Sequence, residues 1–434
     1  MGSTKGSDKQ VTGKVGKPAK NVQFRIMVGS YEHNLLCLSL MMTGTSQPIF
    51  QPIFHFQAHS LSIKSIDLAK RYLVTGSNDE HIRIYDLQKR KELGTLLSHQ
   101  GTITTLRFSN EGISSKGKHQ EISPKLSEAS DKSGKWLLSG SEDGKIIIWR
   151  TKDWELFGTL KGHQGAINDL AIHPTGRVAI SVSKDQTIRL WNLMTAKKAA
   201  VLKIKGKDHL GQSGEFVKWS TDGNHFVVGL LNQLLVYTLT PGAKIIKKVK
   251  FNSTLMCIDI LKINGKEWLI TGHGNGTIDF VDFEALLNSK DETGEDKVWE
   301  TKAQVFKPVF SLRGHTNRIK GITYLNNEET NNTPYLISVS SDGKIVVWDV
   351  SDDVRDQVAV YDSGERLNCV VASPETVEKF NTMKRRYDET EDLAAASESE
   401  YETDGEEVKR VMLNEGKKKR KGKKNKKKVS VTLE

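Results

Sequence analysis

Residues 161–193, KGHQGAINDLAIHPTGRVAISVSKDQTIRLWNL, contain three short runs of alternating apolar residues, separated by turn residues. Runs of this length that alternate with period two and are rich in Ile, Val and Trp are typical of β-strands. Polar residues occupy set positions around them. His163 precedes the first run, Ser181 lies in the second, Asp185 lies in the turn that follows, and Trp191 lies in the third. The stretch therefore predicts a small antiparallel sheet with its own set of polar residues.

The same four positions recur in three further stretches. In each, an aspartate lies six residues before the aromatic residue and a hydroxyl residue lies ten before it. The further sets are His99, Ser139, Asp143 and Trp149; His315, Ser338, Asp342 and Trp348; and His59, Thr75, Asp79 and Tyr85. A repeat of roughly 40 residues that starts with Gly-His and ends near Trp-Asp resembles the WD-repeat signature. We therefore expect an all-β protein, a β-propeller.

The recurring polar residues have a structural explanation. Neighbouring blades cover both faces of a blade, so the polar groups inside it must bond to one another. We expect one chain of hydrogen bonds in each set, in which the histidine bonds to the aspartate and the hydroxyl group to the aromatic residue. A catalytic triad of His163, Ser181 and Asp185 is the alternative. It is disfavoured because the set recurs in four blades, whereas an enzyme needs one site.

The number of strand-like runs predicts seven blades between residues 21 and 373. The first blade lacks an innermost strand, and one further inner-strand-like segment, LNCVVAS, lies at 367–373. We expect this segment to close the ring by pairing beside the first blade, which removes exposed sheet edges. The fifth and sixth blades have lost several signature residues, so six or eight blades remain open by counting alone.

Several segments fall outside the strand rhythm. Three are insertions within the propeller: 110–134, 284–301 and 326–333. A short helix is predicted at 374–387, where Ser-Pro precedes apolar residues at near-helical spacing. Residues 1–20 form a basic arm with little apolar content, and residues 388–434 form an acidic and then lysine-rich tail. Both compositions are typical of disordered segments.

The net charge of +11 is concentrated at the ends of the 434-residue chain. Residues 409–434 contain 12 Lys or Arg and two Glu, and residues 1–20 contain five Lys and one Asp, which leaves −3 for the rest. The densest run comprises Lys417, Lys418, Lys419, Arg420, Lys421, Lys423, Lys424, Lys426, Lys427 and Lys428. It predicts salt-sensitive binding to nucleic-acid phosphates and a nuclear or nucleolar address signal.

Composition and motifs argue against several classes of protein: disulfide-rich, zinc-binding, membrane-spanning and nucleotide-binding proteins. Three scattered cysteines without CxxC spacing predict neither a disulfide scaffold nor a zinc site. No apolar run approaches the ~18 residues of a membrane span. The nearest P-loop match, Gly112 to His119, has His119 where Ser or Thr must reach the metal. We expect no enzyme activity, no cofactor, no metal and no small-molecule substrate.

Strand order places the loops on two faces. Loops between first and second strands, and between third and fourth strands, share one face, which takes the three insertions and both arms. The opposite face carries the short turns beside each histidine and aspartate, where propellers often bind peptides. The candidate partner-binding residues on that face, expected to be exposed, are Asn78, Gln100, Glu142, Gln164, Lys184 and Arg318.

Residues 60–195 resemble a narrower group, the maintenance-of-killer / Pak-kinase-interacting family of WD-repeat proteins. The similarity rests on the Tyr-Asp ending of the second blade, on Asp153-Trp154 and on His173-Pro174, and it extends over roughly residues 22–372. Insertion 110–134 departs from the shorter animal members. The resemblance implies a nucleolar scaffold in large ribosomal subunit (60S) assembly that binds pre-60S ribosomal proteins, assembly factors and pre-rRNA. It also implies an alternative, an adaptor that negatively regulates a p21-activated kinase.

Overall fold

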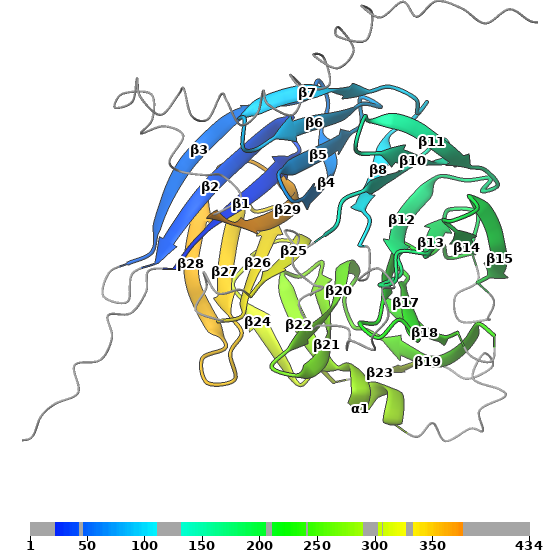
Figure 1. Ribbon diagram of the computed structural model, residues 1–434. Helices are drawn as coiled ribbons and strands as arrows, with labels where there is room; N and C mark the ends of the chain where they lie inside the picture. Colours follow the sequence, from blue (N-terminus) through cyan, green and yellow to red (C-terminus); the bar gives the residue numbers. More distant parts are fainter. Residues whose placement is uncertain are drawn as a thin grey trace, which may run out of the picture. The chain divides into compact units, whose positions relative to one another are not determined.

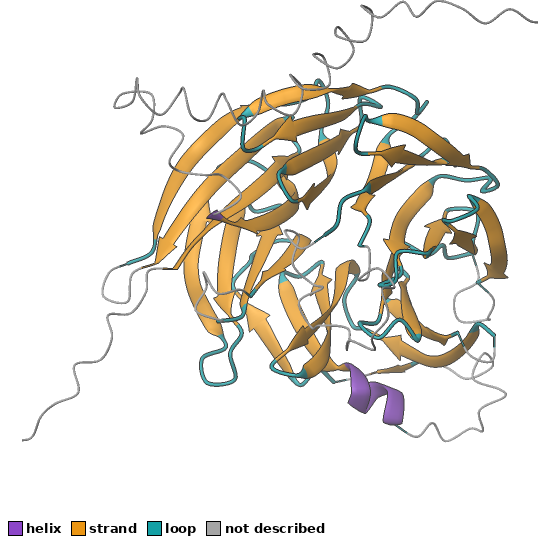
Figure 2. Ribbon diagram, in the orientation of Figure 1, coloured by secondary structure: helices purple, strands orange, loops and turns teal. Residues whose placement is uncertain are grey.

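The computed structural model describes residues 22–42, 47–110, 132–204, 211–239, 242–289, 303–305, 307–326 and 333–375. Within these ranges the chain forms seven sheets that follow one another around a central axis (Figure 1). The predicted seven-bladed β-propeller is therefore confirmed. Almost all regular structure is strand, as Figure 2 shows. Among the described helices, none has the length and apolar content that crossing a bilayer requires.

Each of the first four blades has four strands. The first blade consists of β29 (Leu367–Pro374), β1 (Val22–Ser30), β2 (Asn34–Met42) and β3 (Ile49–Gln57). The second consists of β4 (Ile63–Ala69), β5 (Tyr72–Ser77), β6 (Ile82–Asp86) and β7 (Lys91–Leu96). The third consists of β8 (Ile103–Phe108), β9 (Trp136–Ser141), β10 (Ile146–Arg150) and β11 (Glu155–Leu160). The fourth consists of β12 (Ile167–Ile172), β13 (Val178–Ser183), β14 (Thr187–Asn192) and β15 (Lys197–Lys203).

The last three blades follow the same plan with one addition. The fifth consists of β16 (Phe216–Trp219), β17 (His225–Gly229), β18 (Gln233–Thr238), β19 (Lys244–Lys250) and the short β23 (Gln304–Val305). The sixth consists of β20 (Leu255–Ile263), β21 (Lys266–His273), β22 (Thr277–Asp282) and β24 (Phe310–Arg313). The seventh consists of β25 (Ile319–Leu325), β26 (Tyr335–Ser340), β27 (Lys344–Asp349) and β28 (Asp356–Asp362).

The ring closes where the sequence predicted it. Strand β29 pairs antiparallel with β1 in a register that runs from Phe24 opposite Pro374 to Gly29 opposite Cys369. The buried Arg25 side chain donates a hydrogen bond to Glu375 Oε1 at 2.7 Å. In Figure 1 the orange β29 lies directly beside the blue β1. The two ends of the described chain therefore meet in one blade.

Apolar side chains fill the seven contacts between neighbouring blades. Each contact has its own cluster of buried residues within the described chain. Between the third and fourth blades, for example, Leu138 and Ile148 pack with Leu170 and Trp191. Alternation in each strand produces this arrangement because successive side chains point to opposite faces, and each face meets a different neighbour. The core is thus a closed circle of similar interfaces.

Two sequence boundaries need correction. Residues 284–288, assigned to an insertion, belong to helix α1 (Phe283–Asn288), whose Phe283 and Leu286 are buried. The Asp282 carboxylate caps this helix by accepting a hydrogen bond from the Ala285 amide at 3.0 Å. Strand β23 was not predicted, and it pairs parallel to β19. A two-residue strand has too little pattern to be found by periodicity.

The remaining boundary predictions fall largely outside the described residues. These are the basic arm at 1–20, most of the three insertions, residues 376–387 of the predicted helix, and the tail at 388–434. Of the predicted helix, Pro374 ends β29 instead, and Glu375 is held by Arg25.

Candidate functional site

The fourth blade brings its four signature residues together. His163 Nδ1 lies 2.9 Å from Asp185 Oδ2, and His163 Nε2 lies 2.8 Å from Ser181 Oγ. Trp191 Nε1 donates to Ser181 Oγ at 2.8 Å. Because the indole can only donate, the serine hydroxyl hydrogen is left for His163 Nε2. His163 is then neutral and donates from Nδ1 to the carboxylate.

The third and seventh blades repeat this arrangement. In both, one serine hydroxyl lies between the histidine Nε2 and the indole N–H, and the histidine Nδ1 faces the aspartate. The third blade has His99–Asp143 at 3.1 Å, His99–Ser139 at 2.8 Å and Trp149–Ser139 at 2.9 Å. The seventh has His315–Asp342 at 3.2 Å, His315–Ser338 at 2.9 Å and Trp348–Ser338 at 2.8 Å.

The second blade differs at its aromatic position. His59 lies 3.0 Å from Asp79 Oδ2 and 2.7 Å from Thr75 Oγ1, as in the other three blades. The Tyr85 hydroxyl group, however, is buried without a hydrogen bond of normal geometry among the described residues, although Thr75 and Arg83 lie close enough to oppose the rise in its pKa that burial causes. A phenol carries its oxygen at the tip of the ring, whereas an indole carries its N–H on the side. The Thr75 hydroxyl group thus lies near Tyr85 but does not make the bond of normal length and angle that the serines of the other three blades make with their tryptophans.

Burial sets the protonation of these networks. Burial lowers the pKa of His59, His99, His163 and His315, and the facing aspartates oppose this effect only in part. Burial alone would raise the pKa of Asp185, but hydrogen bonds from Thr187, His163 and the Gln164 amide outweigh it and lower the pKa to about 2. Each network therefore holds a neutral imidazole beside an ionised carboxylate.

The networks do not form a nucleophilic site. Ser139, Ser181 and Ser338 are each 0% exposed, and so is Thr75. A substrate would have no access to a hydroxyl group that is enclosed by the blade and bonded on two sides. The four sets act as internal supports that hold the turn after the second strand against the loop before the first.

The sixth blade contains a further histidine network that sequence spacing did not reveal. His273 Nε2 lies 3.1 Å from Asp279 Oδ2 and 3.0 Å from Thr271 Oγ1, and His273 is fully buried. This histidine comes from the end of the second strand rather than from the loop before the first. The sequence offered one signal for this network: His273 lies six residues before Asp279, an aspartate of the next strand.

The candidate partner-binding residues lie on the face that carries these turns. Five are exposed: Gln100, Glu142, Gln164, Lys184 and Arg318. Asn78 is only half-buried rather than fully exposed, because its Nδ2 donates to Ser62 Oγ at 2.8 Å. Lys184 and Glu142 come from neighbouring blades and their charged groups lie 3.9 Å apart. All six residues lie in loops at the same end of the strands, and their role in partner binding stays a prediction.

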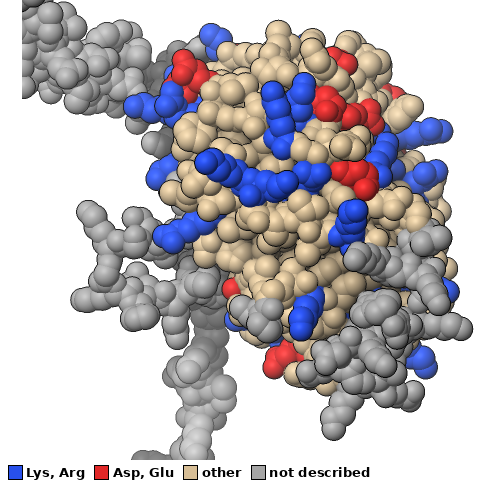
Figure 3. Space-filling view, turned by 90° about the vertical axis from the view of Figure 1, so that its right-hand side faces the viewer, with Lys and Arg blue, Asp and Glu red and all other residues tan. Residues whose placement is uncertain are grey.

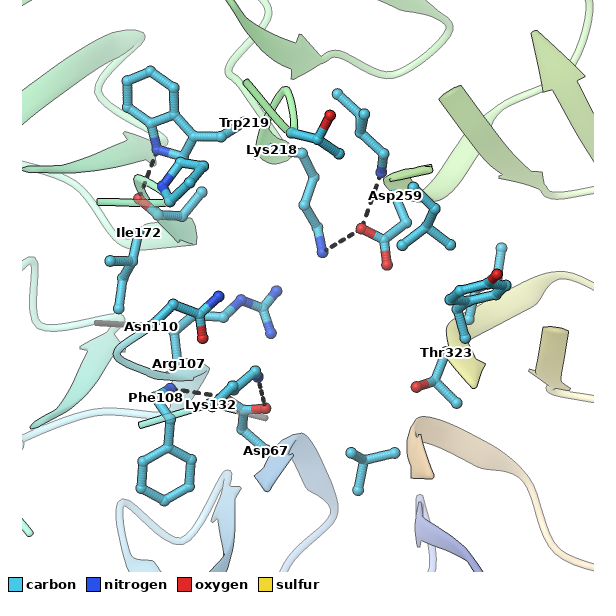
Figure 4. A pocket seen from close by; sticks show the side chains of 18 of the residues that line it. Asp67, Arg107, Phe108, Asn110, Lys132, Ile172, Lys218, Trp219, Asp259 and Thr323 are labelled. Carbon is cyan, nitrogen blue, oxygen red and sulfur yellow. Dashed lines mark hydrogen bonds and ion pairs between the residues drawn. The ribbon is translucent and has the colours of Figure 1, made fainter. Parts of the chain in front are cut away.

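A central cavity of about 430 Å³ lies on the propeller axis. Inner strands of all seven blades contribute to its lining, together with Asn110 and Lys132, two described residues of the first insertion (110–134). Figure 4 shows the side chains of Arg107 and Lys218 extending into this space from different blades. The cavity therefore opens toward the face that carries the insertions.

Ion pairs around the cavity connect adjacent blades. Arg107 and Asp169 lie 3.2 Å apart. Lys218 and Asp259 lie 3.1 Å apart, and Lys132 pairs with Asp67, as the dashed lines of Figure 4 show. Burial alone would lower the pKa of Arg107, but Asp169, Asp67 and Asp259 raise it. Arg107, Lys132 and Lys218 are thus each paired with a carboxylate. These residues were not predicted from the sequence, although a charged residue inside a buried inner strand was a usable signal.

Asp67 and Asp169 also bond to backbone groups of the next blade. Asp67 Oδ2 accepts from the Phe108 amide at 2.7 Å, and Asp169 Oδ2 accepts from the Val217 amide at 3.1 Å. Each carboxylate therefore compensates its burial with several hydrogen bonds. These contacts make the cavity residues part of the ring's construction.

Comparison with known proteins agrees with this architecture. The family model "WD domain, G-beta repeat" matches residues 50–86, 126–150, 154–192 and 306–349. The chain is 51% identical over 425 residues to Protein MAK11 of Saccharomyces cerevisiae, which covers 95% of this chain and 98% of that protein. The chain belongs to the maintenance-of-killer / Pak-kinase-interacting family of WD-repeat proteins.

Other members of the family are more distant. The chain is 31% identical to p21-activated protein kinase-interacting protein 1-like of Xenopus laevis, over 75% of this chain and 74% of that protein. It is 24% identical to Shk1 kinase-binding protein 15 of Schizosaccharomyces pombe, over 87% of this chain and 95% of that protein. A family of WD-repeat propellers with such names is a family of scaffolds or adaptors that bind proteins.

The lysine-rich run of this family member, residues 417–428, lies outside the described residues. Its predicted role in binding nucleic acid stays a prediction.

Proposed function

We propose that this chain is a non-enzymatic WD-repeat scaffold that acts in the nucleolar assembly of the large ribosomal subunit. In this role the ring binds ribosomal proteins and assembly factors of the pre-60S particle. The lysine-rich tail binds pre-rRNA through its phosphates. The 51% identity to Protein MAK11 over nearly the full length of both chains supports a shared role for the two proteins.

The distribution of charge carries this proposal. The two ends hold +4 and +10, while the rest of the chain holds −3. This remainder includes the ten acidic residues of 388–407, so residues 21–373 carry 43 Lys or Arg against 38 Asp or Glu, a net charge of +5. That charge is small for a ring of this size and far less dense than the charge of the tail, so most of the ring is suited to protein contacts. The 417–428 run has ten Lys or Arg in twelve positions and no aromatic residue. Such a run binds phosphates without stacking on bases, and its affinity falls steeply with salt.

Sedimentation of cell extracts through a sucrose gradient tests the proposal. At low salt the chain should sediment with large pre-ribosomal particles. Replacing the ten Lys or Arg of 417–428 with Gln should weaken this association. Raising the salt from about 50 to about 200 mM should weaken that of the wild-type chain, since a protein with six to ten phosphate contacts loses about 10³-fold or more in affinity.

Residues 388–407 offer a matched control, because they contain ten acidic residues and no basic ones. Replacing these ten with Asn or Gln changes as many positions in the same tail. This variant should remain in the particle fractions. If the wild-type chain stays at the top of the gradient at low salt, the proposal is wrong.

We also propose a nucleolar location that depends on the same run. A fluorescent fusion of the full chain should collect in nucleoli, and the Gln variant of 417–428 should spread through the cell. Equal nucleolar signal from both proteins would show that the run is not the address.

Kinase binding is a second candidate, favoured by the names of the relatives from Xenopus laevis and Schizosaccharomyces pombe. In this case the purified chain should lower the phosphorylation of a model peptide by a p21-activated kinase, and the 417–428 variant should do so equally well. An unchanged rate at saturating chain would remove this candidate.

A further inference from the structure

The outer flank of the fourth blade is unusually basic. Residues 161–204 contain seven Lys or Arg and two Asp, a net charge of +5. Both aspartates are engaged inside the ring: Asp169 bonds to Arg107 and to the Val217 amide, and Asp185 bonds to His163. All the exposed charges of this blade are therefore positive.

Five of these cations form what we name the lysine flank. Lys197, Lys198 and Lys203 lie on β15, Arg177 lies in the turn before β13, and Lys161 lies in the loop before β12. All five are exposed, and among the described residues none has a carboxylate within 4.0 Å. Figure 3 looks onto this side of the ring and shows Lys and Arg side chains crowded across it, with fewer Asp and Glu.

Protection of a sheet edge does not explain this charge. Lysines on outer strands can prevent edge-to-edge pairing with another molecule. If that were their purpose here, the outer strands of the other blades should be equally basic. Strand β3 has no charged residue, β11 has one Glu, β7 has one Lys and one Glu, and β28 has two Asp. These four outer strands therefore have no cluster of positive charge to protect them from edge-to-edge pairing. Only β19, in the neighbouring blade, is also lysine-rich, and its Lys244 and Lys250 are exposed.

The flank has the dimensions of a phosphate-binding track. Six residues separate Lys197 from Lys203, so their Cα atoms span about 20 Å of extended strand. At about 3.4 Å of helix axis per phosphate on one strand, this length faces on the order of six phosphates. Exposed lysines on flexible stems act as point charges and suit a phosphate chain without regard to base sequence.

We infer that the lysine flank is a second RNA-binding surface, one that holds the phosphate backbone against the folded ring independently of the 417–428 run. This inference rests on the proposed function, because it names where that RNA would contact the propeller. It predicts that the tail captures RNA, while the flank fixes the ring's orientation on it. The alternative ligand for the lysine flank is the chain's own acidic segment, 388–407, which would compete with RNA for the same lysines.

RNA-binding measurements on the full chain test the inference. The probe is a fluorescein-labelled 20-nucleotide single-stranded RNA, and the background carries Gln at the ten tail positions so that flank binding is visible. The test variant is Lys197→Gln, Lys198→Gln and Lys203→Gln. The control variant is Lys89→Gln, Lys91→Gln and Lys152→Gln, three exposed lysines on the second and third blades.

The test variant should reduce the slope of log affinity against log salt by about 2, at about 0.7 per lost phosphate contact. The control variant should leave the slope unchanged. All six lysines are exposed, so both variants should retain the wild-type urea midpoint. Equal slopes for the two variants would overturn the inference.

A carbodiimide crosslinking experiment on the wild-type tail distinguishes the competing occupant. Crosslinks from residues 388–407 to Lys197, Lys198 or Lys203 that persist with excess RNA would show that the flank holds the acidic segment, and would overturn the inference. Their loss when RNA is added would support it. Gradient sedimentation shows separately whether the proposed function holds. If the test variant still sediments with the particles but has the same dependence of RNA affinity on salt as its parent, only the RNA-binding role of the lysine flank is refuted.

Discussion

The Ser181 hydroxyl group bonds to two buried side chains at once. It accepts from the Trp191 indole and donates to His163 Nε2, both at 2.8 Å. A buried polar group that loses its partner costs about 1–3 kcal/mol. One hydroxyl group therefore satisfies two groups that water cannot reach. In the second blade, Thr75 bonds to His59 at 2.7 Å and makes only a weak contact with Tyr85, whose hydroxyl group has no partner of normal geometry among the described residues.

Removing these hydroxyl groups should give unequal losses. We expect Ser181→Ala to lower the free energy of unfolding by about 3 kcal/mol, since two buried groups lose a partner. Thr75→Val removes a hydroxyl group at similar volume and leaves one group unpaired, so its loss should be about half as large. Urea unfolding followed by tryptophan fluorescence measures both. Equal losses would contradict the two-partner arrangement.

The pH dependence of stability follows from the same networks. Burial lowers the pKa of the four histidines, so the unfolded chain binds protons first as the pH falls below about 6.5. Stability is therefore full above that pH and decreases below it. Asp185, with its pKa lowered from 3.8 to about 2, adds a loss of about 2 kcal/mol as the pH falls through this range.

Urea midpoints measured from pH 8 to about pH 2 check this expectation. His163→Gln should flatten the decrease between about pH 7 and pH 5, because one titrating group is gone. A midpoint that rises as the pH falls would contradict the neutral state of the buried histidines.

At the scale of elements, β29 decides whether the ring is closed. It is the innermost strand of the first blade, nearly all its residues are buried, and it pairs with β1. Asn368 also donates to the Ile63 carbonyl of the second blade at 2.9 Å. An inner strand of this kind has neighbours on both faces, whereas an outer strand such as β3 tolerates Pro52.

A proline should therefore destabilise the protein much more in an inner strand than in an outer strand. Val370→Pro in β29 should lower the thermal midpoint strongly, by the equivalent of about 3 kcal/mol, and expose β1 to proteases. Val360→Pro, at a 40% exposed position of the outer strand β28, should cost much less. Similar midpoints for the two variants would show that β29 does not hold the ring together.

At the scale of the whole molecule, charged residues of the inner strands connect the blades around the cavity. Asp169, 6% exposed, bonds to Arg107 of the third blade and to the Val217 amide of the fifth. A single side chain of the fourth blade thus contacts both neighbours. Removing one partner of a buried ion pair is costly because the other charge stays behind.

Asp169→Ala should lower the free energy of unfolding by about 2 kcal/mol or more, with partial exposure of Arg107 limiting the loss. The matched control is Glu92→Ala, whose pair with Arg83 lies on the surface at 3.4 Å. It should change stability little, since exposed ion pairs contribute at most about 1 kcal/mol. Urea unfolding compares the two. A larger loss for Glu92→Ala would mean that these inner charges do not join the blades.

Repetition made much of this molecule predictable. The period of about 40 residues, the strand alternation and the spacing of histidine, hydroxyl, aspartate and aromatic residue follow from local chain geometry. They were therefore readable in the sequence alone, as was the pairing of 367–373 with the first blade. The charge of the two arms is likewise a property of composition.

Other features depend on which parts of the chain meet. The pairing of β23 with β19, the His273 network and the ion pairs around the cavity join residues whose spacing is not repeated. The basic character of the fourth blade depends on Asp169 and Asp185 being turned inward, which leaves only lysine and arginine charges outside. Periodic patterns specify strands and their order because these are local, whereas burial and contacts across blades arise only when the ring closes.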